Sequence, residues 1–371
     1  MKPLYLLAIA ILLMVIFWDL IITLLYSHLG RGQSTSEDDN RHGAKRGLID
    51  HLYHNTNNWH SRSLRNYPRQ TAQLMPEIDV SQLTRDKFIE LTNNFSTPLI
   101  VRRFLSGTAA TRKWSLNYFK KHYGKLKLPI IQNGDIDNHA KYVRHHQANY
   151  TTLTLGQLID SIKRGGKHYL NNVSRIFGVY PQLLDDMELE RIERYTGIDV
   201  KHSNNVTHMF MGGKKTGSSL HCSITGNFFY NIKGQKKWVL IHPKYSRHLL
   251  PNISRTGLFV VSHFDILKDN PNSVVFNIPR YEMVLNEGDL FFNPPWWWHA
   301  VENVTPYTIA CANRFSNFWI GLRNNPLFSL VFFSHPISNW QDFNFASKQE
   351  SNLKFDQSLL KDILRKKRKV L

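Results

Sequence analysis

Two stretches nearly eighty residues apart carry side chains that could form a metal site. His221 and Ser223 lie two residues apart in a run that becomes strand-like at Phe228, and His299 ends a second run that begins at Gly288. Because side chains two apart on a strand point to the same side, His221 and Ser223 can face one side, where His299 could join them. Iron sites of the facial-triad type use two histidines and one carboxylate, and here a serine stands at the carboxylate position.

Three ordered motifs surround these residues. They are Gly-x-x-x-x-Gly-x-x-x-His, which ends at His221; Asn-x-x-x-x-x-x-Gly-x-Lys, which ends at Lys236; and Gly-Asp-x-x-x-x-Pro-x-x-Trp-Trp-His, which ends at His299. In these motifs, and more broadly from about Ile78 to Phe318, the sequence resembles the JmjC and cupin-like family of Fe(II)- and 2-oxoglutarate-dependent oxygenases. The resemblance is strongest to the small protein-hydroxylase branch of that family, and several motifs in order are more specific than one.

The resemblance implies a double-stranded β-helix of the jelly-roll type with Fe(II) held inside the barrel mouth. His221 and His299 match the two histidine ligands, and Ser223 takes the place of the third. Lys236 matches the lysine that pairs with the distal carboxylate of 2-oxoglutarate. The other positions implied to contact this co-substrate or to line its pocket are the hydroxyl of Ser218 and the amides of Asn227 and Asn313.

Ser223 is where this sequence departs from the family, which has Asp or Glu two residues after the first histidine. A neutral hydroxyl is a poor ligand for Fe(II), so metal affinity should fall sharply. Iron could still bind through the two histidines, another carboxylate could take over, or the barrel could only bind a ligand. Two functions follow: a 2-oxoglutarate- and Fe(II)-dependent protein hydroxylase, or a catalytically inactive pseudo-oxygenase that binds a peptide, glycan or partner protein.

The elements that must position these residues are mainly strands. Short β-rich runs alternate with turns between His208 and Phe318, which favours an antiparallel barrel or sandwich over a parallel sheet. Helical patterns precede them over 84–93, 114–123 and 153–162. We therefore expect a mainly β fold with flanking helices, and the resemblance narrows it to a jelly-roll or cupin barrel. The strand-like runs are 209–211, 227–232, 237–241, 283–285 and 308–312.

The amino-terminal residues are apolar from 4 to 18 and again from 20 to 26, about the length that a bilayer requires. We expect residues 1–27 to form a signal-anchor transmembrane helix and residues 28–76 to form a flexible polar stalk with little packed structure. The JmjC/cupin-like domain would then cover 77–325. Residues 326–371 would hold an apolar segment, which either packs on the domain or contacts a second copy in a homodimer, and a basic helical tail.

The net charge of +19 favours anionic partners, although a basic solvated surface explains it equally well. The expected partners are the membrane, through the amino-terminal helix, and a protein or peptide; nucleic acid is the weakest candidate. Glycosylation triplets after the apolar segment favour a type II single-pass glycoprotein with its domain in the secretory lumen. The two cysteines, Cys222 and Cys311, are too few for a disulfide framework. The triplets begin at Asn94, Asn149, Asn172, Asn205, Asn252 and Asn303.

Overall fold

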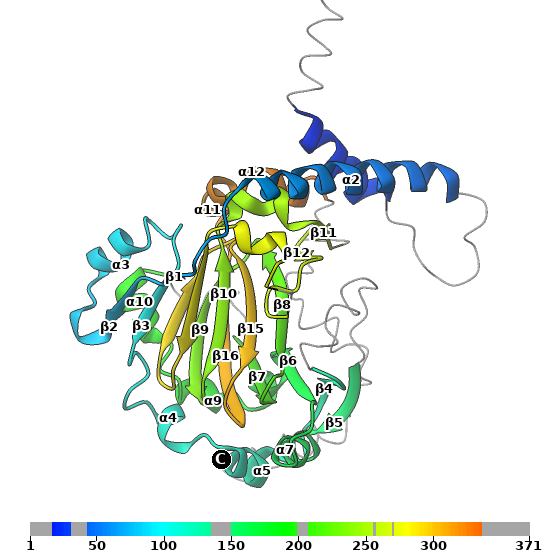
Figure 1. Cartoon of the computed structure of the whole chain (residues 1–371). Helices are drawn as coiled ribbons and strands as arrows, with labels where there is room; N and C mark the ends of the chain where they lie inside the picture. The colour runs from blue at the N-terminus through cyan, green and yellow to red at the C-terminus, as the bar shows by residue number, and fades with distance from the viewer. Residues whose placement is uncertain are drawn as a thin grey trace, which may run out of the picture.

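Two β-sheets form the centre of the molecule in a computed structural model that describes residues 17–30, 43–134, 150–198, 207–254, 257–268 and 271–335 (Figure 1). The larger sheet contains β2 (Glu77–Asp79), β3 (Leu99–Arg102), β4 (Lys127–Ile131), β5 (Tyr150–Thr154), β6 (Tyr169–Val173), β7 (Thr207–Gly213), β9 (Gly226–Lys233), β14 (Leu290–Asn293) and β16 (Tyr307–Phe315). The smaller sheet contains β1 (Gln73–Leu74), β8 (Gly217–Ser223), β10 (Lys236–Ile241), β11 (Pro251–Ile253), β12 (Phe259–Ser262), β13 (Arg280–Leu285) and β15 (Trp298–Asn303).

The strand order is that of a jelly roll. The nine-stranded sheet runs β2-β3-β14-β9-β16-β7-β6-β4-β5, and the seven-stranded sheet runs β1-β13-β10-β15-β8-β12-β11. From β7 to β10, and again from β13 to β16, successive strands alternate between the two sheets. The predicted mainly β fold with flanking helices is confirmed, and all five predicted strand runs lie inside β7, β9, β10, β13 and β16.

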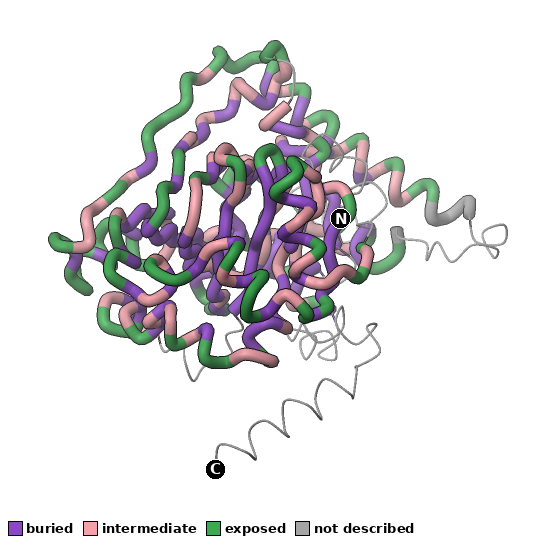
Figure 2. The backbone as a smooth tube through the Cα atoms, turned by 90° about the horizontal axis from the view of Figure 1, so that it is seen from below, coloured by how far each residue is buried: buried purple, intermediate pink, exposed green. Residues whose placement is uncertain are grey.

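The inner faces of the two sheets share one apolar cluster. Alternation along β10 shows how it is built: Trp238 and Leu240 belong to this inner cluster, whereas Val239 and Ile241 belong to the cluster on the other side of the sheet. Buried backbone runs through the middle of the molecule and exposed positions lie mostly around it (Figure 2). The remaining buried inner side chains are Met75, Ile100, Ile131, Tyr169, Phe210, Phe229, Met283, Leu285, Phe291, Trp297, Val301, Ala310 and Ala312.

Short helices cover the outer face of the nine-stranded sheet. Thr84, Ser115 and Thr154 each accept a backbone N–H as the N-cap of a helix, which explains where three of the predicted helices begin. Their apolar faces join one cluster with the outward side chains of β7, β9 and β16. The helices are α3 (Arg85–Leu91), α4 (Ala109–Lys113), α5 (Leu116–Tyr123), α7 (Leu155–Lys163), α8 (Arg175–Val179), α9 (Gln182–Asp185) and α10 (Glu190–Thr196), with the 3₁₀ turn η3 (Val80–Gln82) before α3.

The outer face of the seven-stranded sheet is covered by segments from both ends of the chain. The long helix α2 (Gly43–Ser63) lies across the top of the sheets beside α12 (Pro326–Phe333) (Figure 1). Phe328, Val331 and Phe332 are buried there, so the apolar carboxyl-terminal segment packs on its own domain. The remaining elements are α11 (Phe318–Asn324) and the 3₁₀ turns η2 (Leu64–Asn66), η4 (Pro243–Leu249) and η5 (Val274–Asn277).

Helix α2 corrects the expectation of a flexible stalk over residues 28–76. Tyr53 is 1% exposed, and its hydroxyl donates a hydrogen bond to the Pro251 carbonyl at 2.9 Å. The polar composition of this segment concealed a helix because only one narrow face, which includes Tyr53, Asn57 and Ser61, is buried. The matching carboxyl-terminal prediction, a basic helical tail, lies at 336–371, outside the described residues.

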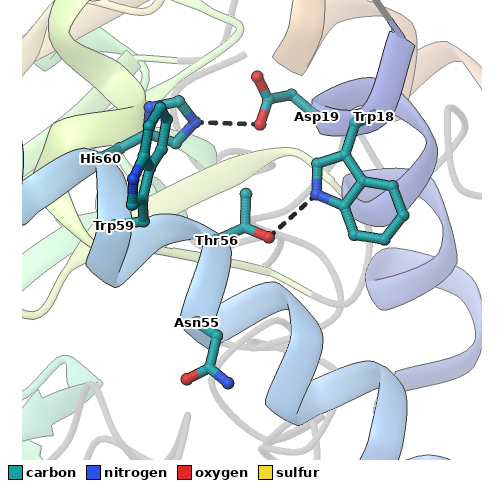
Figure 3. A pocket seen from close by; sticks show the side chains of 6 residues that line it. All are labelled: Trp18, Asp19, Asn55, Thr56, Trp59 and His60. Carbon is teal, nitrogen blue, oxygen red and sulfur yellow. Dashed lines mark hydrogen bonds and ion pairs between the residues drawn. The ribbon is translucent and has the colours of Figure 1, made fainter. Parts of the chain in front are cut away.

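The second half of the predicted transmembrane segment packs against the domain. Residues 17–25 are helical and continue as the π-helical turn η1 (Tyr26–Gly30), in which Tyr26 stacks on Tyr53 with ring centroids 3.9 Å apart. Figure 3 shows Asp19 bonded to His60 of α2, and Arg247 of η4 pairs with the same carboxylate. Within the described residues, no helix is both long and apolar enough to cross a membrane, and residues 1–16 are not among them.

Candidate functional site

His221 and His299 meet as predicted, on two neighbouring strands of the inner face. Their Cα atoms are direct partners in the pairing of β8 with β15, and their ring centroids are 4.2 Å apart. The two histidines lie near one end of the sandwich, where β8, β14 and β16 end and where β9 and β15 begin. Both rings keep some exposure to solvent although the neighbouring strand residues are buried.

Both imidazoles are held neutral with a fixed tautomer. Burial lowers the pKa of His221 to about 4 and lowers the pKa of His299 well below its usual value. The Nδ1 atoms lie 2.7 Å from the Ser219 carbonyl and 2.9 Å from the Trp297 carbonyl, so each Nδ1 must carry the proton that it donates. The Nε2 atoms therefore keep their lone pairs, as in a metal-binding histidine.

Ser223 does not present its hydroxyl to this pair. Its Oγ accepts the backbone N–H of Thr225 at 3.0 Å and lies 2.6 Å from the Thr225 hydroxyl, which closes a local turn. Cys222, between His221 and Ser223, faces the apolar cluster on the outer face of the seven-stranded sheet. In the part of the chain that the structure describes, no three His, Cys, Asp or Glu side chains gather as a metal site would require.

Arg314, which sequence reasoning overlooked, lies on the same inner side as the histidines. On β16, the small side chains of Ala310 and Ala312 face inward, and Arg314 follows them in alternation. The positive charge of its guanidinium contributes to the lowered pKa of both His221 and His299. The sequence did contain a signal for this residue, because Arg314 follows two alanines at alternate positions of an otherwise apolar strand.

A row of polar side chains crosses three strands at this level. Asn227 of β9 is the direct partner of Arg314 on one side and of Asn293 on the other. The Asn293 amide nitrogen lies 3.2 Å from His299 Nδ1, which joins this row to the histidines of the other sheet. Asn227 was predicted and Asn293 was missed, although Asn293 stands six residues before His299 in the third motif.

Lys236 faces inward but toward the other end of β15. Its side chain is fully buried, and Nζ donates to Asn303 Oδ1 at 2.5 Å. Asn303 is four residues beyond His299 on β15, so the two positions are separated by about 13 Å along the strand. Between the two levels, the Trp238 ring packs against His299 with centroids 5.6 Å apart. Burial lowers the pKa of Lys236 to about 7, since no carboxylate among the described residues pairs with it.

The two remaining predicted residues behave differently. Ser218 is opposite the inward-facing Val301, because the register of β8 shifts between the pairs formed by His299 and Val301. Asn313 is opposite Phe228, which belongs to the apolar cluster on the outer face of the nine-stranded sheet. The Asn313 amide donates a hydrogen bond to Thr207 Oγ1 at 3.1 Å. The expectation that Asn313 lines the inner site is therefore wrong, since alternation on β16 turns it away.

The donor set does not fit the Fe(II) and 2-oxoglutarate expected from the resemblance. Two neutral imidazoles are available, but Ser223 is bonded to its own turn and Arg314 adds a positive charge next to the pair. Lys236, the expected carboxylate partner, donates to Asn303 instead, with Trp238 at the level between it and the histidines. The arrangement suits a ligand that brings negative charge better than one that brings positive charge.

Comparison with known proteins identifies the family. A family described as "Cupin-like domain" matches residues 65–319. The chain is 27% identical over 213 residues to JmjC domain-containing protein D of Dictyostelium discoideum, covering 52% of this chain and 46% of that protein. It is 24% identical over 239 residues to Jumonji C domain-containing protein 5 of Drosophila melanogaster, covering 62% of this chain and 57% of that protein.

A third relative carries a different name. The chain is 22% identical over 261 residues to tRNA wybutosine-synthesizing protein 4 of Emericella nidulans, covering 67% of this chain but 23% of that protein. The matches to these relatives thus span between about a quarter and just over half of their lengths. Because the family match covers well over half of the chain and agrees with the observed sheets, this protein belongs to the cupin-like domain family, together with proteins named for the JmjC domain.

Proposed function

We propose that this protein is a pseudo-oxygenase of the cupin-like family, which binds a ligand in its barrel and does not hydroxylate a substrate. The observation that carries the proposal is Ser223, whose hydroxyl is bonded to Thr225 and leaves the histidine pair without an acidic third ligand among the described residues. The predicted peptide, glycan or partner protein would be bound, not modified.

Electrostatics supports this choice over a working iron site. A facial triad has a carboxylate that offsets part of the charge of Fe(II). Here the third position is neutral, and the guanidinium of Arg314 lowers the affinity of both histidines for a proton. The same positive potential acts twice as strongly on a divalent ion as on a proton.

A second candidate is the Fe(II)- and 2-oxoglutarate-dependent protein hydroxylase of the original expectation. The fixed tautomer of His221 and His299 favours it, because both Nε2 lone pairs are available to a metal. This function requires iron to bind through two imidazoles without an anionic side chain from the described residues.

The two candidates differ in turnover of 2-oxoglutarate. Full-length protein, loaded anaerobically with Fe(II), would be assayed for succinate release beside a Ser223→Asp variant. We expect no release from the parent because the acidic ligand is missing. Fe(II)-dependent release from the parent would overturn the pseudo-oxygenase proposal and establish the hydroxylase.

The Ser223→Asp variant also serves as a positive control for the fold. Release from the variant alone would show that the remaining site can still support chemistry once a carboxylate is restored. Binding of Fe(II), measured separately by calorimetry, should be at least about tenfold tighter in the variant than in the parent.

We also propose that the protein is anchored to a membrane by its amino-terminal apolar residues. The apolar run begins at residue 4, and the described part of it, residues 17–25, has one face packed on the domain and another exposed. A type II orientation with the domain in the secretory lumen remains our proposal for its location. The exposed apolar side chains of this face are Phe17, Trp18, Ile21 and Leu25.

A further inference from the structure

We infer that the histidine-pair cluster, defined as His221, His299, Asn227, Asn293 and Arg314, binds an oxyanion in the position that a metal ion would take. The oxyanion is a carboxylate or phosphate group carried by the ligand that the barrel binds. This inference rests on the proposed function, because it specifies the ligand of a barrel that does not hold catalytic iron.

The first argument is an arginine without a counter-charge. Arg314 is only partly exposed, and its Nη2 donates to the Asn172 amide oxygen at 2.6 Å. No carboxylate in the described ranges forms an ion pair with Arg314, and its buried Nε–H has no hydrogen-bond partner there. Burial of a cation without an opposite charge is costly, so an anionic ligand would relieve that cost.

The second argument is the orientation of the Asn293 amide. Because His299 Nδ1 already donates its proton to the Trp297 carbonyl, it cannot also accept a proton from the Asn293 NH₂ group 3.2 Å away. Exchange of the amide oxygen and nitrogen resolves the conflict, since oxygen and nitrogen positions are assigned from the surrounding hydrogen bonds. The NH₂ group then takes the buried position at which Oδ1 has no partner.

The third argument is the arrangement of donors on one level of the sandwich. Arg314, Asn227 and Asn293 are successive partners across β16, β9 and β14, and Asn293 reaches His299 on the facing sheet. Asn227 lies between Arg314 and Asn293 in this row and adds an NH₂ donor, beside an amide oxygen that is buried without a partner in the described part of the chain. One guanidinium and two amides on adjacent strands form a converging set of N–H donors, the chemistry that recognises carboxylate and phosphate.

The residue types at this level also discriminate against a cation. The cluster contains one guanidinium, that of Arg314, and no Asp or Glu is among its five residues. Farther along the inner face, Lys236 is a second buried amine without a carboxylate in the described part of the chain. Lys236 is bonded to Asn303, so the inference is confined to the cluster, and dicarboxylates serve as probes only because they carry the same carboxylate group as acetate.

The test is anion binding without metal. Full-length protein, stripped of metal with a chelator, would be titrated calorimetrically with acetate, inorganic phosphate, succinate and 2-oxoglutarate. We expect saturable binding of at least one of these probes. Arg314→Gln should weaken that binding by about tenfold or more, because it removes the charged donor.

Arg280→Gln is the matched control, because Arg280 is another strand arginine with little exposure but has Glu282 as its partner. It should leave anion binding unchanged. Ser223→Asp should abolish anion binding, since a carboxylate near the pair would repel the ligand. If Arg314→Gln fails to fold, as judged by circular dichroism, Ser223→Asp and the charge-retaining Arg314→Lys carry the comparison.

Three outcomes would overturn the inference: no probe binds, binding appears only after a divalent metal is added, or both Arg314→Gln and Ser223→Asp bind as tightly as the parent. These results are separate from the turnover assay. Metal-free binding together with succinate release would refute the pseudo-oxygenase proposal and leave the oxyanion site standing. Absence of both binding and release would refute the oxyanion site alone.

Discussion

Ser223 and Arg314 together determine which charge the histidine pair can accept. A carboxylate at 223 would offset a metal cation, whereas the observed hydroxyl is bonded within the turn to Thr225. Arg314 adds positive charge on the inner face, where the pKa values of both histidines are already lowered by burial. At the residue scale, the two histidines of a metal centre are present without its acidic ligand, and the neighbouring arginine is the basis of the oxyanion site that we propose.

Lys236 gives a prediction about stability at the same scale. Its pKa is about 7 in the folded protein, because burial disfavours the ammonium form, against an ordinary value of 10.5. Between these values the unfolded chain binds more protons than the folded one, so stability should rise with pH across that window. Lys236→Met should remove this rise and, near neutral pH, increase the free energy of unfolding by about 2 kcal/mol, after the lost bond to Asn303 is subtracted.

Urea denaturation at neutral and alkaline pH measures both effects. Lys237→Met is the control, because the Lys237 side chain is 40% exposed and forms an ion pair with Glu282 on the neighbouring strand β13. Its substitution should leave the rise with pH in place. An unchanged rise in Lys236→Met would mean that the buried amine does not titrate as its surroundings require.

At the scale of elements, strand register decides which predicted residues share the site. Simple alternation puts Ser218 and His221, three apart, on opposite faces of β8. A shift in the pairing of β8 with β15 instead brings Ser218 opposite Val301 on the inner face. Asn313 has no such irregularity between it and Arg314, so those adjacent residues face opposite ways.

Helix α2 supplies a second prediction, about how the amino-terminal helix is held. Tyr53 stacks on Tyr26 and bonds the Pro251 carbonyl, so it joins the helix at 17–30 to the domain. Tyr53→Ala should lower the free energy of unfolding by about 3–5 kcal/mol, because it leaves a cavity where a large ring was buried. It should also speed hydrogen exchange in residues 17–25.

Tyr67→Ala is the comparison for this variant, since Tyr67 is 58% exposed. It should change stability by less than about 0.5 kcal/mol. Equal stability of Tyr53→Ala and the parent would show that α2 contributes little to the fold.

At the scale of the whole molecule, helices and turns cover the outer faces of the two sheets, and residues 17–30 pack against α2 at one of them (Figure 1). Cys222 and Cys311 are free and belong to clusters on the outer faces of the two different sheets. The glycosylation triplets are not equivalent. Asn94 is exposed, whereas Asn303 is fully buried against Lys236 and Asn252 is 6% exposed, so a glycan on the folded protein could occupy Asn94 but not these two.

Membrane anchoring is tested at this scale. Full-length protein expressed in eukaryotic cells should stay in the membrane pellet after extraction at alkaline pH, because an apolar run of this length partitions into the bilayer. Deletion of residues 4–16 should move it to the supernatant. A deletion of similar length in the basic tail, residues 357–369, should not. Release of the full-length protein by the extraction would contradict the proposed anchor.

The sequence alone determined the strands of the sandwich, the convergence of His221 with His299 and the missing acidic ligand, because motif order and local alternation are properties of the chain itself. It misjudged α2, whose polar surface hides a narrow buried face, and it assigned Asn313 to the site. Only the tertiary structure decided that Arg314 and Asn293 accompany the histidines and that Lys236 bonds Asn303. Those relations depend on register and on the packing of one sheet against the other, which no short window of residues contains.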